Sequence, residues 1–299
     1  MSKMQEGDKL MHKAAKAAAP SLMSMRLKAD WETAAQLYGR AAQCYRQAGS
    51  LEKAVEAFEA ASAANVSLGS LWQAAKDMEA AADFSQQRKQ WGLAHRCYGR
   101  AADLYMSGGR HTTGADCLAK GARAIEEHEP EKAMAMVEQA LDVYGTEDKG
   151  LLALDLYRQA IGTAILLQRF QQSAALQMSM ASLCGSGGTA RTSQCMAYLG
   201  AIVTLLIACD GEGAWRCYQD AMAASEFACS EEGTAAQMLI DAYRSGDDQA
   251  VKKAVASCQT LKFLDNKVAR LAVRLPQGNT KQVAASLDAA AGGGFAGMS

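Results

Sequence analysis

Large residues recur at a fixed interval of 20 positions through the first half of the chain. The openers of successive steps are Trp31, Leu51, Leu71, Trp91 and His111, and Glu131 continues the series. A step of this length holds one helix of about four turns and a tight turn, because an α-helix advances by about 3.6 residues per turn. Two steps make a helical hairpin, so the pattern predicts stacked pairs of antiparallel helices.

Small and aromatic residues share one face within each step. In the first step they recur at intervals of three and four residues, which is typical of an amphipathic helix, at Trp31, Ala34, Ala35, Tyr38, Ala41, Ala42 and Tyr45. Alanine allows close approach of neighbouring helices, and the aromatic rings fill the remaining space. Gly49, Gly69 and Gly109 stand just before openers, where a helix commonly ends in a left-handed residue.

The helical pattern continues more loosely over 152–167, 170–184, 189–209, 213–227 and 231–243, and then through shorter elements to about residue 275. We therefore predict an all-α fold: a right-handed α-solenoid of hairpins like those of tetratricopeptide repeats (TPRs), closed by a C-terminal helical bundle. The expected divisions are an N-terminal helix and apolar loop (1–29), the solenoid (30–210), the bundle (211–276) and a flexible tail (277–299).

Composition and charge limit the possible partners. The formal net charge is −1, so no long-range attraction to nucleic acid is expected. The nine cysteines include no Cys-x-x-Cys pair, which favours free thiols in a reducing cytoplasm. The N-terminus lacks the apolar core of a secretory signal, and the apolar run Ile202–Cys209 is too short to span a bilayer. We expect a cytoplasmic protein.

The sequence motifs give no support to an enzyme. The four histidines make no His-x-x-x-His spacing, and the glycine-rich pieces lack the lysine and hydroxyl residue of a phosphate-binding loop. No metal site, cofactor or catalytic residue is therefore predicted. A solenoid presents a long face that can lie along an extended partner, so binding is the expected function.

A basic segment is the first candidate binding site. Its one acidic residue is Asp103, and its five basic residues are Arg88, Lys89, Arg96, Arg100 and Arg110. Arg96 and Arg100 lie one turn apart and project from the same side of their helix. This segment would suit an acidic rod such as a helical bundle, with the charges mainly speeding association. The alternative is an ordinary solvated helix face.

Two apolar segments near the chain ends are further candidates. The first segment has the apolar residues Leu22, Met23, Met25 and Leu27 beside the cations Arg26 and Lys28. It suits either contact with a membrane interface or a cap on the open end of the solenoid core. The second places Phe295 and Met298 in an Ala/Gly-rich tail. These two residues are either a contact that orders the tail on binding or incidental hydrophobes at a disordered end.

Several strings resemble the soluble NSF attachment proteins (SNAPs) of the gamma type. They are LKADWETAAQLYGRAA (Leu27–Ala42), EPEKAMAMVEQALDVY (Glu129–Tyr144), FACSEEGTAAQMLIDAYRSGDDQAV and LKFLDNKVARLAVRLP. They follow one another in the family's order, and the resemblance covers residues 6 to about 276. It implies an adaptor that coats an assembled SNARE bundle and recruits N-ethylmaleimide-sensitive factor (NSF), the hexameric AAA ATPase that supplies nucleotide hydrolysis.

The resemblance also implies residue roles. Arg110, with the rest of the basic segment, would contact the SNARE bundle, the loop residues Leu22 to Leu27 would aid peripheral membrane attachment, and Met298, beside Phe295, would help to stimulate the ATPase. Asp116 stands where alpha-type members carry a functional lysine. The alternative to a SNARE adaptor is a TPR-like co-chaperone that clamps a peptide terminus, which would need Lys and Asn residues converging in one groove.

Overall fold

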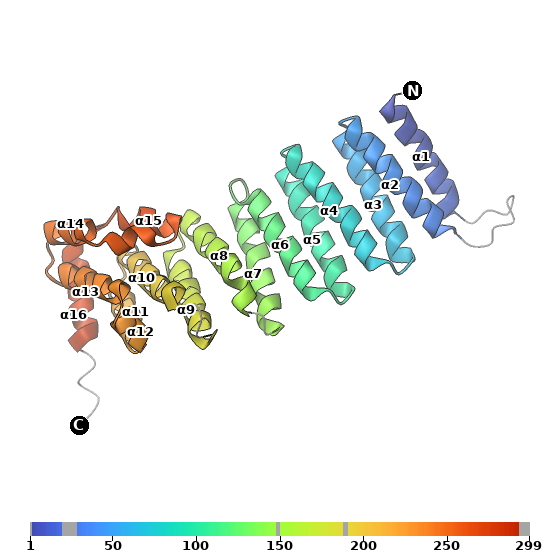
Figure 1. Ribbon diagram of the computed structural model, residues 1–299. Coiled ribbons are helices and arrows are strands. Elements are labelled where there is room, and N and C mark those ends of the chain that lie inside the picture. The colour runs from blue at the N-terminus through green and yellow to red at the C-terminus, as the bar shows by residue number, and fades with distance from the viewer. Residues whose placement is uncertain (1, 20–28, 148–149, 188–190, 293–299) are drawn as a thin grey trace. The chain divides into compact units, whose positions relative to one another are not determined.

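The computed structural model describes residues 2–19, 29–147, 150–187 and 191–292. The described residues form helices joined by turns and contain no strand, which confirms the all-α prediction. They divide into two compact units, Met1–Asp148 and Lys149–Ser299. Figure 1 shows the helices of both units in chain order.

The first unit is an array of antiparallel helices in which each helix packs on the next (Figure 1). Helices begin at residues 31, 51, 71, 91 and 111, so the 20-residue register is confirmed. The helices are α1 (Lys3–Ala18), α2 (Trp31–Gln47), α3 (Leu51–Ser67), α4 (Leu71–Gln87), α5 (Trp91–Ser107), α6 (His111–Ile125) and α7 (Pro130–Thr146).

Alanine and aromatic residues build the core of this array. Ala74 and Ala94 are fully buried, as the register requires of residues at helix contacts. Phe58 and Tyr98, which stand at equivalent places in α3 and α5, are buried beside them. Burying one large apolar side chain stabilises a fold by about 1.5–3 kcal/mol, so the repeated small-then-large pattern supplies much of the stability of each hairpin.

The turns between helices share one backbone conformation. Gly49, Gly69 and Gly109 have φ values of 74°, 74° and 72°, as expected for left-handed residues at helix ends. The same place between α4 and α5 holds Lys89, with a φ of 59°. Its turn is closed like the others, because the Gln90 N–H donates to the Ser85 carbonyl at 2.9 Å. A non-glycine residue in this conformation is strained by about 1–2 kcal/mol.

Replacing Lys89 by glycine should therefore stabilise the first unit by about 0.5–1 kcal/mol, the relief of strain being partly offset by glycine's greater entropy in the unfolded chain. Thermal or urea unfolding measures the change. Gly69→Ala is the matched control, because no atom would meet its new Cβ, and it should destabilise the unit through the backbone alone. Equal stability of Lys89→Gly and the native chain would contradict the strain argument.

The second unit is organised around α10 (Arg191–Ile207), which is buried on most of its surface and contacts helices on several sides. Its apolar run explains this position, because a helix that is hydrophobic all round must be enclosed by others. The remaining elements are η1 (Gly150–Ala153), α8 (Leu154–Leu166), α9 (Phe170–Gly187), α11 (Gly211–Met222), α12 (Ser225–Ala228), α13 (Glu231–Arg244), α14 (Asp248–Ser257), η2 (Gln259–Phe263), α15 (Asn266–Ala272) and α16 (Thr280–Gly292).

The end of the described chain differs from the expected flexible tail. Residues 280–292 form α16, which packs on α11 and α13. Val283 and Leu287 lie one turn apart and are buried, and Arg244 Nε is 2.8 Å from Asp288 Oδ1. The Ala- and Gly-rich composition concealed this short amphipathic stripe. The expected boundary between solenoid and bundle at residue 210 stays a prediction.

No helix in the described ranges combines the length and the apolar character needed to cross a membrane.

Candidate partner-binding surface

The structure distributes the five predicted basic residues over three places in the first unit. Arg88 and Lys89 lie in the α4–α5 turn, where Arg88 Nη2 donates to the Gly49 carbonyl of the α2–α3 turn at 3.0 Å. Arg110 precedes α6 at the opposite end of α5. Since α5 has 17 residues, these ends are separated by about 25 Å. Arg96 and Arg100 stand between them on α5.

Arg96 and Arg100 share an open hollow on the face formed by α3 and α5. Both are exposed, whereas Ala94 and Tyr98 on the other side of α5 are buried, as the sequence pattern predicts. The hollow has a volume of about 440 Å³ and is also lined by Glu59, Ser62, Ala63, Val66 and Met78. In the described part of the chain neither guanidinium has an ion pair or a hydrogen bond, so both remain available to an external anion.

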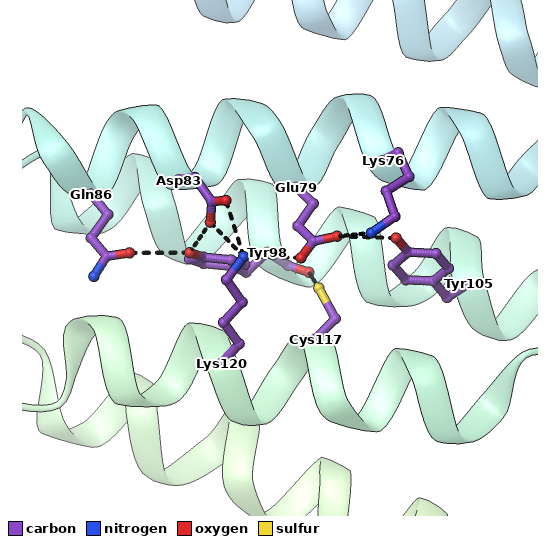
Figure 2. Close-up of polar contacts among 8 residues, drawn as sticks. All are labelled: Lys76, Glu79, Asp83, Gln86, Tyr98, Tyr105, Cys117 and Lys120. Atoms are coloured by element: carbon purple, nitrogen blue, oxygen red, sulfur yellow. Dashed lines mark hydrogen bonds and ion pairs between the residues drawn. The ribbon is translucent and has the colours of Figure 1, made fainter.

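Lys76 of α4 and Lys120 of α6 are in a different state, because they are paired within the fold (Figure 2). Lys120 Nζ of α6 lies 2.9 Å from Glu79 Oε1 and 2.8 Å from Asp83 Oδ1, both on α4. Lys76 Nζ is 3.1 Å from Glu79 Oε2. Ion pairs this exposed stabilise a fold by at most about 1 kcal/mol each, but they leave little free charge for a partner.

Two tyrosines of α5 tie this network to the core. The Tyr98 hydroxyl donates to Asp83 Oδ1 at 2.5 Å, and the Tyr105 hydroxyl donates to Glu79 Oε2 at 3.1 Å (Figure 2). Burial would raise the pKa of Glu79, but hydrogen bonds from Lys120 and Lys76 outweigh it and hold that pKa below its usual value. Glu79 therefore stays ionised, and the network fixes the axial position of α5, with Arg96 and Arg100 on its opposite side.

Tyrosine–carboxylate contacts recur elsewhere in the first unit. The Tyr45 hydroxyl donates to Asp8 Oδ1 at 2.8 Å, and Lys53 Nζ lies 2.7 Å from the same oxygen. Tyr144 of α7 donates to Asp116 Oδ1 at 2.6 Å. Asp116 is thus a structural acceptor here. The sequence signal for these contacts is a carboxylate one helix before a tyrosine, and none of these carboxylates is among the predicted site residues.

A second hollow, of about 760 Å³, lies between α2 and α4 over α3. At its base the Asn65 amide donates to Asp77 Oδ2 at 2.7 Å, and both side chains are buried. Burial raises the pKa of Asp77 to about 6, and hydrogen bonds from Asn65 and Gln73 only partly oppose this effect. Arg40 is the basic residue among the lining side chains. The hollow therefore does not supply the converging lysines of a peptide-terminus clamp.

The raised pKa predicts a pH dependence of stability. The native state holds the Asp77 proton up to about pH 6, while the unfolded chain releases it near 3.8, so stability falls as the pH rises between these values. Asp77→Asn keeps the shape and removes the titration. Between pH 4.5 and pH 7.5 the variant should gain about 2 kcal/mol relative to the native protein, measured by denaturant unfolding. A constant difference over this range would contradict the assignment.

The other predicted site residues lie outside the described residues. They are Leu22, Met23, Met25, Leu27, Phe295 and Met298.

The cysteines are mostly buried free thiols. Seven of the nine are buried, and Cys209 and Cys229 are exposed. Burial raises the pKa of Cys97 to about 11 and that of Cys117 to about 12, so both thiols stay protonated at neutral pH and are poor nucleophiles. In the ranges that the structure describes, no three His, Cys, Asp or Glu side chains gather as metal ligands would.

An array of stacked helical hairpins that leaves the guanidinium groups of Arg96 and Arg100 exposed along one face is typical of a helical-repeat binding protein. Residues 5–275 match the family model described as "Soluble NSF attachment protein, SNAP". The chain belongs to this family, whose members are adaptors and not enzymes.

The curated relatives extend over nearly the whole chain. The gamma-soluble NSF attachment protein of Arabidopsis thaliana is 35% identical over 276 residues, which cover 92% of this chain and 94% of the relative. The protein of the same name from Dictyostelium discoideum is 26% identical over 275 residues, or 91% and 81% of the two chains. Among solved structures, a Rap protein complexed with competence and sporulation factor is similar at a TM-score of 0.38 and 13% identity. The match covers 96% of this chain and 84% of the Rap chain.

Proposed function

We propose that this chain binds assembled SNARE complexes and recruits the ATPase NSF to them, as an adaptor in the disassembly of SNARE bundles during vesicle transport. Membership in the SNAP family and relatives named for NSF attachment support this role. The observation that carries the SNARE contact is the pair of exposed guanidinium groups of Arg96 and Arg100, which have no ion pair in the described residues, whereas Lys76 of α4 and Lys120 of α6 are held in ion pairs.

The three-part distribution of the basic residues refines this proposal. Arg96 and Arg100 form the central contact, and Arg88 with Lys89 at one end of α5 and Arg110 at the other extend it along the helix. A partner that reaches all three places must be at least about 25 Å long, a length that a rod-like helical bundle provides. A short peptide terminus could not span them.

The chain ends complete the proposed adaptor. The apolar residues Leu22, Met23, Met25 and Leu27 would give it peripheral contact with a membrane from the cytoplasmic side, because apolar side chains beside cations suit the headgroup boundary. Phe295 and Met298 would contact the ATPase. No cofactor or nucleic acid is part of this proposal.

A pull-down with purified components tests the function. The protein should bind a preassembled soluble SNARE bundle but not its separate helices, and NSF should be retained only when the adaptor is present. A variant that ends at Gly292 should still bind the bundle and should stimulate ATP hydrolysis less than the full chain. Failure of the full chain to retain either the bundle or NSF would refute the adaptor role.

A further inference from the structure

The exposed large hydrophobic residues of the first unit gather around one turn. In the part of this unit that the structure describes, they are Val66, Leu68 and Trp72, with exposed fractions of 39%, 42% and 46%. Val66 lies in the last turn of α3, Leu68 directly follows that helix, and Trp72 is the second residue of α4. We call these three residues the α3–α4 patch. Single exposed hydrophobes are common, but three within seven positions at one turn are not required by the fold.

The turn closes without the help of these side chains. Gly69 provides the left-handed conformation, with a φ of 74°, and the Ser70 N–H donates to the Asn65 carbonyl at 2.9 Å. The neighbouring α4–α5 turn closes by the same backbone bond and carries Arg88 and Lys89 near the corresponding positions. Polar residues therefore suffice at such a turn, and the apolar ones in the α3–α4 patch call for another explanation.

The patch lies at the edge of the array where α1 ends and α2 begins. Consecutive helices are antiparallel, so the end of α1 and the start of α2 share one edge with the α3–α4 and α5–α6 turns, and the α2–α3, α4–α5 and α6–α7 turns lie at the opposite edge (Figure 1). Side-chain contacts agree with this placement. Leu68 and Ser70 line the same hollow as Glu32 in the first turn of α2.

A cation stands beside the tryptophan at this edge. Trp72 and Arg110 line a common hollow of about 370 Å³ together with Leu71, Leu104 and Tyr105. Arg110 is exposed, and its side chain has no ion pair or hydrogen bond in the described part of the chain. An indole ring next to a free guanidinium matches a phospholipid interface, where tryptophan favours the headgroup level and a cation meets lipid phosphate.

We propose that the α3–α4 patch is a second membrane-contact element, which enters the lipid headgroup region through Trp72 and Leu68 while Arg110, at the end of α5 where the proposed SNARE contact reaches this edge, meets lipid phosphate as well. This inference deepens the proposed peripheral membrane association. The patch flanks a turn at the edge of the array, and its three residues line three different hollows. It is therefore a raised rim that can contact a broad surface, and it does not form a single cleft that would enclose a protein side chain. That shape favours a lipid surface over a protein partner.

Tryptophan fluorescence tests the contact directly. The full-length protein is mixed with vesicles of phosphatidylcholine and phosphatidylserine that carry brominated acyl chains, which quench an inserted indole. Quenching is expected in the native protein and should be largely lost in Trp72→Phe, although Trp31, Trp91 and Trp215 remain. Equal quenching in both proteins, or none in the native protein, would overturn the proposal.

Vesicle flotation measures the contribution of the patch to binding. Leu68→Ser with Trp72→Ser should weaken vesicle binding by about tenfold or more, because two apolar contacts are removed. The matched control is Met238→Ser with Val273→Ser, which changes two residues of the second unit exposed by 40% and 77% and should leave vesicle binding unchanged. Equal vesicle binding by the patch variant and the native protein would refute the inference.

Binding to a soluble SNARE bundle separates this inference from the proposed function. The patch variant should keep native affinity for the bundle and a native melting temperature. If bundle binding falls in parallel with vesicle binding, the patch is part of the protein interface and the membrane assignment is wrong. If the native protein binds no bundle but its vesicle binding depends on the patch, the adaptor proposal fails and the membrane contact stands.

Discussion

Replacing Gly121 by alanine is expected to destabilise the first unit by about 1–3 kcal/mol, because the added methyl group overpacks the interface of α6 with its neighbours. A Cβ on Gly121 would lie 2.6 Å from Met136 Cε and 2.8 Å from Tyr98 Cβ. Tyr98 is fully buried and its hydroxyl is held by Asp83, so it cannot move away without loss of that hydrogen bond. Denaturant unfolding of the full chain measures the effect.

Gly99→Ala is the matched control for this substitution. Gly99 lies inside α5, and no neighbouring atom stands within 4 Å of the Cβ that alanine would add. Alanine there should stabilise the unit by about 0.5–1 kcal/mol through its higher helix propensity. The same chemical change is thus expected to have opposite signs at two helical glycines. Stabilisation by both substitutions would show that α5 and α6 do not approach as closely as the structure indicates.

Reversing Arg96 and Arg100 to glutamate should reduce the association rate with a soluble SNARE bundle by about tenfold or more at low ionic strength. The reason is that both guanidinium groups are free and exposed on one side of α5, so reversal places two anions where the partner carries negative charge. The difference should shrink as salt is added, because exposed charges are screened over about 10 Å at 0.1 M ionic strength. Stopped-flow or surface-based kinetics would measure the rates.

The control for this reversal changes the same charge in the second unit. Lys252→Glu with Lys253→Glu alters two exposed lysines of α14 and should leave the association rate nearly unchanged. An equal loss in both variants would mean that only the net charge of the chain matters. An unaltered rate in the Arg96 and Arg100 variant would remove these residues from the binding surface and leave the two ends of α5 as candidates.

The sequence alone was enough to predict the repeat and the helices that build it. Helix starts at Trp31, Leu51, Leu71 and Trp91 follow from local information, because amphipathic periodicity, alanine content and helix-ending glycines are all read within about 20 residues. The family resemblance rests on the same kind of information, since it depends on strings in collinear order. The buried places of Ala74 and Ala94 follow directly from the register.

Which charges are free was decided only by the tertiary structure. Lys120 and Arg100 both look like exposed helix cations in the sequence, but Lys120 meets Glu79 and Asp83 some 40 residues earlier, whereas Arg100 forms no ion pair with any residue that the structure describes. The tertiary structure likewise decided that the cations of the basic segment lie at both ends of α5 and along it. Ion pairs form between residues that are distant in the chain, and local periodicity contains no information about such pairs.

Packing between distant segments also decided three local features: the helix at residues 280–292, the backbone conformation of Lys89 and the exposure of Trp72. Residues 280–292 look like a loose Ala/Gly tail, yet Val283 and Leu287 are buried because α11 and α13 offer them a surface. Lys89 adopts a left-handed conformation because its two helices pack in the same register as their glycine-linked neighbours, and that packing outweighs the local strain. The exposure of Trp72 likewise depends on which residues the neighbouring helices place around it, so the sequence could fix its helix but not its surroundings.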